Sequence, residues 1–184
     1  YQSELILHYP FNGNTNDASG RNNNGTNYGA VLTADRFGNY NSAYYFDGTN
    51  SYISSANTEN NPFPISISLW FKTATNNGGK IFGFGSAHNG TSNDYDRHIY
   101  MANDGKIYWG VFTGGTATIN SSLSYNDGIW HHVVGIISEA GLFLYIDGSL
   151  IGGNSAVNTS QAYDGYWRVG YDQLFSWPDH PNSL

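Results

Sequence analysis

The segment Ile65–Lys72 alternates between two kinds of position, and this alternation constrains the fold more than any other feature. Its four odd-numbered residues are all large and apolar, whereas three of the four even-numbered residues are polar. Successive side chains of a strand point to opposite faces, so the pattern predicts a strand with one buried face. The sequence contains no long apolar stripe of helical period and no apolar run near the ~20 residues that cross a membrane. We therefore expect an all-β chain.

Further strand candidates are rich in β-branched and aromatic residues and are bounded by turn-forming clusters. They are Lys80–Gly85, His98–Met101, Lys106–Phe112, Ile129–Ser138, Leu142–Ile146 and Tyr166–Tyr171. Asn103–Gly105 and Asp147–Gly148 are predicted hairpin turns, because Asn or Asp followed by Gly tolerates the positive φ that short hairpin loops require. Short strands without intervening helices favour two packed antiparallel sheets. The length of 184 residues fits a single domain.

Composition excludes several classes of partner and chemistry. The net charge is −7 with only seven Lys and Arg residues, so nucleic acid and acidic lipid surfaces are unfavourable partners. The absence of cysteine excludes disulfides, thiolate catalysis and Cys-containing zinc sites. A low content of charged residues with abundant Gly, Asn, Ser and Tyr is typical of secreted or cell-surface modules. Because the chain begins at Tyr1 rather than Met, we expect it to be processed or excised.

Several motifs occur in the order of a known family. They are His8–Asn14, Asp17–Gly20, Phe46–Gly48, Ile65–Lys72, Trp130–Gly135, Leu142–Gly148 and Val169–Asp172. In this order they resemble the laminin-G-like branch of the concanavalin A-like lectin/glucanase superfamily, over nearly the whole chain. The resemblance implies an antiparallel two-sheet jelly-roll sandwich spanning residues 1–184.

The resemblance also implies an incomplete sheet edge. Relatives close the fold with a strand similar to Phe-x-Gly-x-Ile-Asp-x-Val, which pairs beside the N-terminal strand, here Glu4–Tyr9. This chain stops at Leu184 without such a segment. We expect the strand to come from outside these 184 residues, as a continuation of the chain or from a neighbouring subunit.

Catalysis is not expected. Glucanases of the superfamily need two carboxylates on one strand face, but Glu4, Glu59 and Glu139 are each isolated from another acid at the required spacing. The adjacent residues His131 and His132 point to opposite sheet faces, so they cannot chelate one ion together, and a structural role is expected for both.

Calcium is the one metal that the sequence favours. The loop from Asn12 to Gly25 is rich in oxygen donors, which suit a hard cation. In the family this loop often holds a structural calcium, and the matching acid is Asp17, with Asn14 and Asn22 as weaker ligands. The alternative is that these side chains only form Asx-turns.

A glycan site requires an aromatic face flanked by amides and carboxylates. Trp177 is the first candidate, because a Trp beside Pro is more often in a loop than in a core. The remaining ligand-binding candidates are Tyr95, Asp94, Asp96, Arg97 and Tyr171, and Trp109 and Trp167 are more typical of a core. We therefore predict a noncatalytic binding or adhesion module of a secreted or cell-surface protein, which binds carbohydrate, with calcium as a candidate cofactor and a glycan or a surface protein as its partner. The alternatives are an assembly module that packs against neighbours and, third, a relative of the glycoside hydrolases.

Overall fold

The structure, a computed structural model, describes residues 5–181, which form fourteen β-strands and no helix. The strands are β1 (Gly25–Tyr28), β2 (Val31–Thr33), β3 (Ala43–Tyr45), β4 (Tyr52–Ser55), β5 (Glu59–Asn60), β6 (Ile65–Lys72), β7 (Gly79–Gly85), β8 (Tyr95–Met101), β9 (Lys106–Phe112), β10 (Thr116–Ser124), β11 (Trp130–Ser138), β12 (Gly141–Ile146), β13 (Ser149–Asn154) and β14 (Asp164–Gly170). This part of the chain accordingly has no helix that is long and apolar enough to span a membrane.

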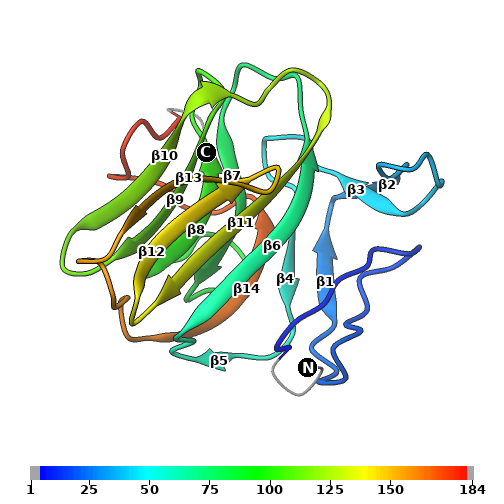
Figure 1. Ribbon diagram of the computed structural model, residues 1–184. Helices are drawn as coiled ribbons and strands as arrows, with labels where there is room; N and C mark the ends of the chain where they lie inside the picture. The colour runs from blue at the N-terminus through cyan, green and yellow to red at the C-terminus, as the bar shows by residue number, and fades with distance from the viewer. Residues whose placement is uncertain (1–4, 182–184) are drawn as a thin grey trace.

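Two antiparallel sheets form the body of the protein. The large sheet has the strand order β1-β4-β14-β7-β8-β9-β10, with β5 paired to β14, and the small sheet has the order β13-β12-β11-β6. Figure 1 shows the two sheets as layers of a sandwich, with the β2–β3 hairpin projecting to one side. The predicted all-β sandwich is confirmed.

The core lies between the sheets. In β6, Ile65, Ile67 and Phe71 are buried and the serines between them are exposed, as the alternation predicts. Trp109 of β9 is fully buried, and its Nε1 donates to the carbonyl oxygen of Ile136, 3.0 Å away. Across from it lies Gly135, where an added Cβ would come within 2.6 Å of the Trp109 ring. Glycine is therefore needed in β11 so that the indole can approach the backbone.

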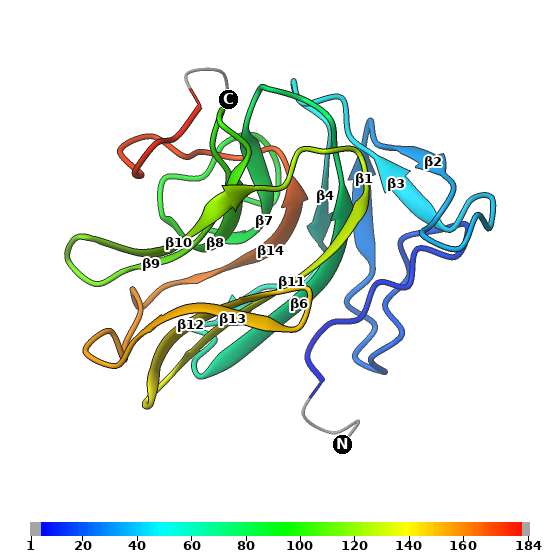
Figure 2. The ribbon, with the colours of Figure 1, turned by 45° about the horizontal axis from the view of Figure 1, so that its top comes forward.

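A second hydrophobic cluster lies on the outer face of the large sheet. Here the C-terminal segment, residues 171–181, crosses β8 and β9 and places Leu174 and Trp177 against Tyr100 and Tyr108. The hydroxyl of Tyr100 donates to the carbonyl oxygen of Pro178 at 2.7 Å. Figure 2 shows this segment in red near β8–β10. The outer face of β8 and β9 is thus covered by the chain itself.

One edge of the small sheet is open within the described residues. β6 pairs with β11 on one side, and no strand among residues 5–181 pairs with its other side. The expected N-terminal strand Glu4–Tyr9 is not formed, because residues 5–9 have no strand conformation, although Ile6 and Leu7 pack against the core. Glu4 lies outside the described residues, and a closing strand from outside the chain stays a prediction.

Candidate functional site

A groove opens at the rim of the sandwich, between the loop that joins β3 to β4 and the loop that joins β6 to β7. Its volume is about 370 Å³, at the lower end of the roughly 300–1,000 Å³ typical of small-ligand sites. The groove is lined by Tyr45, Phe46, Asp47, Gly48, Thr49, Thr73, Thr75 and Asn77. Its lining combines one exposed aromatic ring with hydroxyl, amide and carboxylate groups.

Asp47 organises the first wall. Its Oδ1 accepts hydrogen bonds from the backbone amides of Thr49, Asn50 and Ser51 and from the Ser51 hydroxyl, at 2.8–3.2 Å. These bonds hold the pKa of Asp47 well below its usual value, because they stabilise the charged carboxylate. No group among residues 5–181 donates to Oδ2. The carboxylate therefore stays ionised and has one oxygen available to a ligand.

The opposite wall consists of two consecutive ST-turns, in which a threonine hydroxyl accepts a hydrogen bond from the backbone amide two residues later. Thr73 Oγ1 accepts a hydrogen bond from the Thr75 amide at 3.2 Å, and Thr75 Oγ1 accepts one from the Asn77 amide at 3.0 Å. Because each hydroxyl acts as an acceptor here, its hydrogen remains able to donate outward. Asn126 fixes this wall from another loop, through a 3.0 Å bond to the carbonyl oxygen of Thr75.

Tyr45 supplies the aromatic surface. It ends β3, opposite Val31 of β2, and both side chains are 62% exposed. An exposed Tyr ring offers an apolar face and a polar hydroxyl, a combination that suits the mixed surface of a sugar ring. The groove can thus stack against one face of a small polyol while its walls accept and donate hydrogen bonds.

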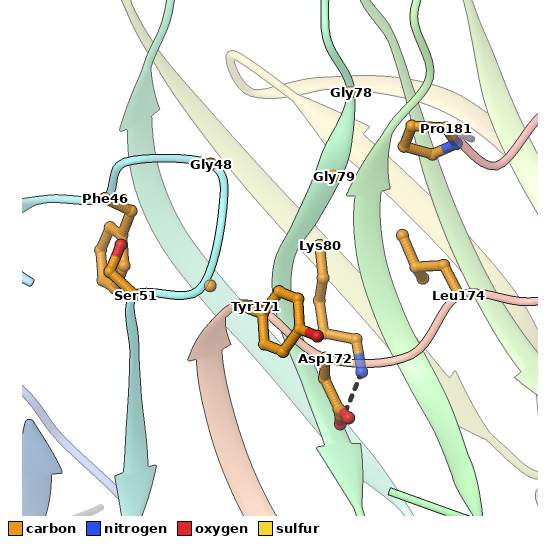
Figure 3. Close-up of a pocket in the computed structure, with 11 residues that line it drawn as sticks. Phe46, Gly48, Ser51, Gly78, Gly79, Lys80, Tyr171, Asp172, Leu174 and Pro181 are labelled. Carbon is orange, nitrogen blue, oxygen red and sulfur yellow. Dashed lines mark hydrogen bonds and ion pairs between the residues drawn. The ribbon is translucent and has the colours of Figure 1, made fainter. Parts of the chain in front are cut away.

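A smaller cavity lies nearby, between the β3–β4 loop and the C-terminal segment (Figure 3). Its volume is about 60 Å³, far below the roughly 300–1,000 Å³ typical of small-ligand sites. At its base Lys80 Nζ lies 3.0 Å from Asp172 Oδ2, with both side chains fully buried. Burial lowers the pKa of Lys80 to about 8, against the opposing effect of the Asp172 charge. Tyr171 lines this cavity rather than a surface site, and the cavity is too small for a sugar ring.

Asp96 and Arg97, both predicted to bind a ligand, are fully buried and ion-paired with each other. The guanidinium also donates to Asn61, to Ser160 and to the carbonyl oxygens of Pro62 and Gln161. These contacts tie two loops to β8 and leave no face for a ligand. The prediction is corrected: Tyr95–Arg97 begins a strand, and the pair fastens loops.

Trp177 lies in a loop, as expected, but it is only 3% exposed. Its ring packs edge-on against His98, with ring centroids 4.7 Å apart. Its face is therefore not available to a sugar, contrary to the prediction. The hydroxyl of half-buried Tyr95 donates to the carbonyl oxygen of Phe175, and Asp94 accepts from Gln161 Nε2 at 2.8 Å. The structure does not bring the predicted residues together as one open site.

The predicted calcium loop is held by hydrogen bonds. The two carboxylate oxygens of Asp17 accept from the amides of His8, Ser19 and Asn23 and from the Ser19 hydroxyl, at 2.7–3.0 Å. Burial opposes ionisation here, but these bonds hold the pKa of Asp17 below its usual value.

The other two predicted calcium ligands bring no further carboxylate. Asn14 Oδ1 accepts from the Asn16 amide, and Asn22 is exposed with φ of 55°. Residues 5–181 contain no cluster of three His, Cys, Asp or Glu side chains suited to a metal. Because both Asp17 oxygens already have two donors, this geometry fits the Asx-turn alternative better than a cation, and calcium stays a prediction.

The two central histidines lie on opposite faces of β11. His131 is 6% exposed, and its ring nitrogens lie 2.7 Å from Asp147 and 3.1 Å from Asp127. His132 lies on the outer face, where it stacks on Trp70 and bonds to Ser68 at 2.8 Å. Both rings are engaged by neighbouring side chains of the fold.

A sequence comparison assigns most of this chain to a known superfamily. A sequence model described as the concanavalin A-like lectin/glucanases superfamily matches residues 47–182. The chain belongs to this superfamily. The resemblance and the jelly-roll class predicted from the motifs are confirmed. A search of curated proteins found no significant match.

Several solved structures share the fold. Domain 4 of AbnA, an extracellular arabinanase from Geobacillus stearothermophilus solved in complex with arabinotriose, matches with a TM-score of 0.60 and 17% identity, over 96% of this chain and 86% of that one. Laminin α1 domains LG4-5 of mouse match with a TM-score of 0.52 and 16% identity, over 71% of this chain and 36% of that one. A pentraxin from Limulus polyphemus matches with a TM-score of 0.51 and 20% identity, over 72% of this chain and 63% of that one. At these identities the likeness establishes the fold alone.

The rim groove was not predicted from the sequence. Phe46–Gly48 contributed only to the family resemblance, and the run Thr73–Asn77 has only the composition of a turn. No signal in the sequence indicates that these two loops, which are more than twenty residues apart, lie side by side.

Proposed function

We propose that the chain is a noncatalytic carbohydrate-binding module of a secreted or cell-surface protein, and that it binds its ligand in the rim groove. The exposed Tyr45 ring beside the Asp47 carboxylate carries this proposal, because sugar sites combine an aromatic face with a few convergent polar groups. The AbnA domain, a structure with the same fold, was solved with arabinotriose.

The absence of a carboxylate pair in the groove supports a noncatalytic role. Glycosidases flank the scissile bond with two carboxyl groups, roughly 5–10 Å apart. Of the residues that the structure describes, Asp47 is the only acid that lines the groove. Elsewhere, Asp96 and Asp172 are buried in ion pairs, so neither can face a substrate.

The test is binding of a panel of neutral oligosaccharides, measured by titration calorimetry for the wild type and for Tyr45→Ala. We expect Tyr45→Ala to weaken binding about tenfold, since aromatic contacts contribute roughly 0.5–1.5 kcal/mol beyond their buried area. Tyr40→Ala is the matched control, because Tyr40 is 87% exposed and does not line the groove. Binding that survives Tyr45→Ala unchanged would contradict this location of the site.

The open edge of β6 favours a second candidate function, that of an assembly module. An eight-residue strand with one unpaired edge can accept a strand from another chain. Strand addition uses backbone groups of β6 and not the rim groove, so the two functions can be tested separately.

A further inference from the structure

We infer that the rim groove selects neutral saccharides and rejects acidic ones such as uronates and sulfated sugars. This inference rests on the proposed function, because it assigns a ligand class to the same groove. It is carried by the charges that line the groove and by the positions of all seven basic side chains.

The fixed charge of the groove is negative. Asp47 Oδ1 is saturated by four donors of its own loop, whereas Oδ2 has no partner among residues 5–181. Hydrogen bonds to Oδ1 depress the pKa of Asp47, so the charge persists at any pH at which the protein would encounter a glycan. Oδ2 accepts hydrogen bonds from sugar hydroxyls. An anionic substituent at the same position would instead meet a like charge.

Among residues 5–181, no Lys or Arg lines the groove to offset this charge. Three of the chain's seven basic side chains, Lys80, Arg97 and Arg168, are buried and make internal ion pairs, hydrogen bonds or ring contacts. Lys106 pairs with Asp104, and Arg21 lies in the loop before β1.

The two remaining cations belong to the outer face of the small sheet. The Arg36 guanidinium is sandwiched between the rings of Phe37 and Trp70, at 4.3 and 4.4 Å from their centroids. Lys72 is exposed at the end of β6, on the face that carries Trp70. Lys72 directly precedes the groove residue Thr73, so it is the cation whose contribution an experiment must exclude.

The walls provide the groups that a neutral polyol needs. Thr73 and Thr75 each use the hydroxyl oxygen as an internal acceptor and can donate the hydrogen outward, while Asp47 can only accept. A sugar hydroxyl both donates and accepts, so it can satisfy both walls at once. A carboxylate or sulfate only accepts, so it can bond to the Thr wall but not to Asp47.

The experiment compares matched oligosaccharides, such as cello-oligosaccharides and the corresponding β-1,4-linked oligoglucuronates, which differ only in oxidation at C6. Calorimetric titration at low and high salt is run on the wild type, Asp47→Asn, Asn77→Asp and Lys72→Ala. Asp35→Asn is the matched control, because Asp35 also accepts turn amides and is partly exposed but does not line the groove.

We expect each neutral ligand that binds to bind at least tenfold more tightly than its uronate counterpart at low salt. The ratio of the uronate Kd to the neutral Kd should decrease at high salt, because screening weakens the repulsion between exposed charges. Asp47→Asn should lower this ratio of dissociation constants, and Asp35→Asn should leave it unchanged. Asn77→Asp should widen the ratio, and it provides a test even if Asp47→Asn fails to fold.

Three results would overturn the inference. If a uronate binds as tightly as its neutral counterpart, selection by charge is refuted while the proposed function stands. If Lys72→Ala then loses the uronate binding, Lys72 is the cation responsible. An Asn77→Asp variant with an unchanged ratio also refutes it. Failure of every neutral and acidic probe to bind refutes the proposed function, and the inference with it.

Discussion

The buried pair Asp96–Arg97 gives the sharpest distinction between a structural and a binding role. In Asp96→Ala, the fully buried Arg97 guanidinium loses the one carboxylate that pairs with it within residues 5–181. The backbone amides of Phe112 and Gln161 also lose the acceptor Oδ2, at 3.2 and 3.4 Å. Removing one partner of a buried ion pair costs about 3–5 kcal/mol, because the remaining charge stays desolvated. Arg97 keeps four other acceptors, so we expect a loss near the lower end of that range.

The free energy of unfolding is measured by urea denaturation, with Asp94→Ala as the matched control. Asp94 is two residues away and accepts one side-chain hydrogen bond, from Gln161, at a half-buried position. Its removal should cost about 1 kcal/mol, the usual value of a single hydrogen bond. The Asp96→Ala urea midpoint should therefore fall several times further than that of the control. An unchanged midpoint together with lost glycan binding would refute the structural assignment and restore Asp96 as a binding residue.

Three further predictions concern other parts of the fold. Burial opposes the charged form of His131, but the hydrogen bonds and charges of Asp147 and Asp127 raise its pKa. Protonated His131 therefore stabilises the fold fully below about pH 6.5, and this stabilisation is lost as the pH rises through the raised pKa. The urea midpoint should fall over this pH range in the wild type and not in His131→Gln. If calcium binds at Asp17, EDTA lowers the melting temperature of the wild type but not of Asp17→Ala; an absence of any EDTA effect leaves the loop with its Asx-turns alone. Backbone amides on the open edge of β6 should exchange hydrogen faster than those of β11, and equal protection in the monomer would show that this edge is covered.

The sheet framework was predictable because strands with one buried face carry a period-two pattern. Ile65–Lys72 and the segments that became β7, β9, β11, β12 and β14 were found within one or two residues of their ends. β1 to β5 were not predicted, and β10 and β13 were also missed, because β10 is largely polar and four of the six residues of β13 are exposed. Edge strands bury less surface, so their sequences carry a weaker signal.

The candidate site was less predictable than the sheets. Charged residues are rarely buried, so Asp96 and Arg97 were expected at the surface. Only the structure shows that Arg97, at a positive-φ position in β8, reaches two loops. Tyr45 and Thr75 meet only because the β3–β4 and β6–β7 loops end at the same rim. Such a juxtaposition depends on long-range strand pairing, which alternation within one segment cannot specify.

The internal use of charge also shapes the surface. Arg97, Arg168 and Lys80 have buried cationic groups, and within the described part of the chain two carboxylates, those of Asp96 and Asp172, are buried with them. More positive than negative side chains are thus removed from the surface of a chain whose net charge is already −7. The same contacts that fasten the loops therefore leave the accessible surface more acidic than the composition suggests. The negative net charge of the accessible surface adds a long-range repulsion of anions to the local charge of Asp47, whereas neutral sugars approach the groove without an electrostatic penalty.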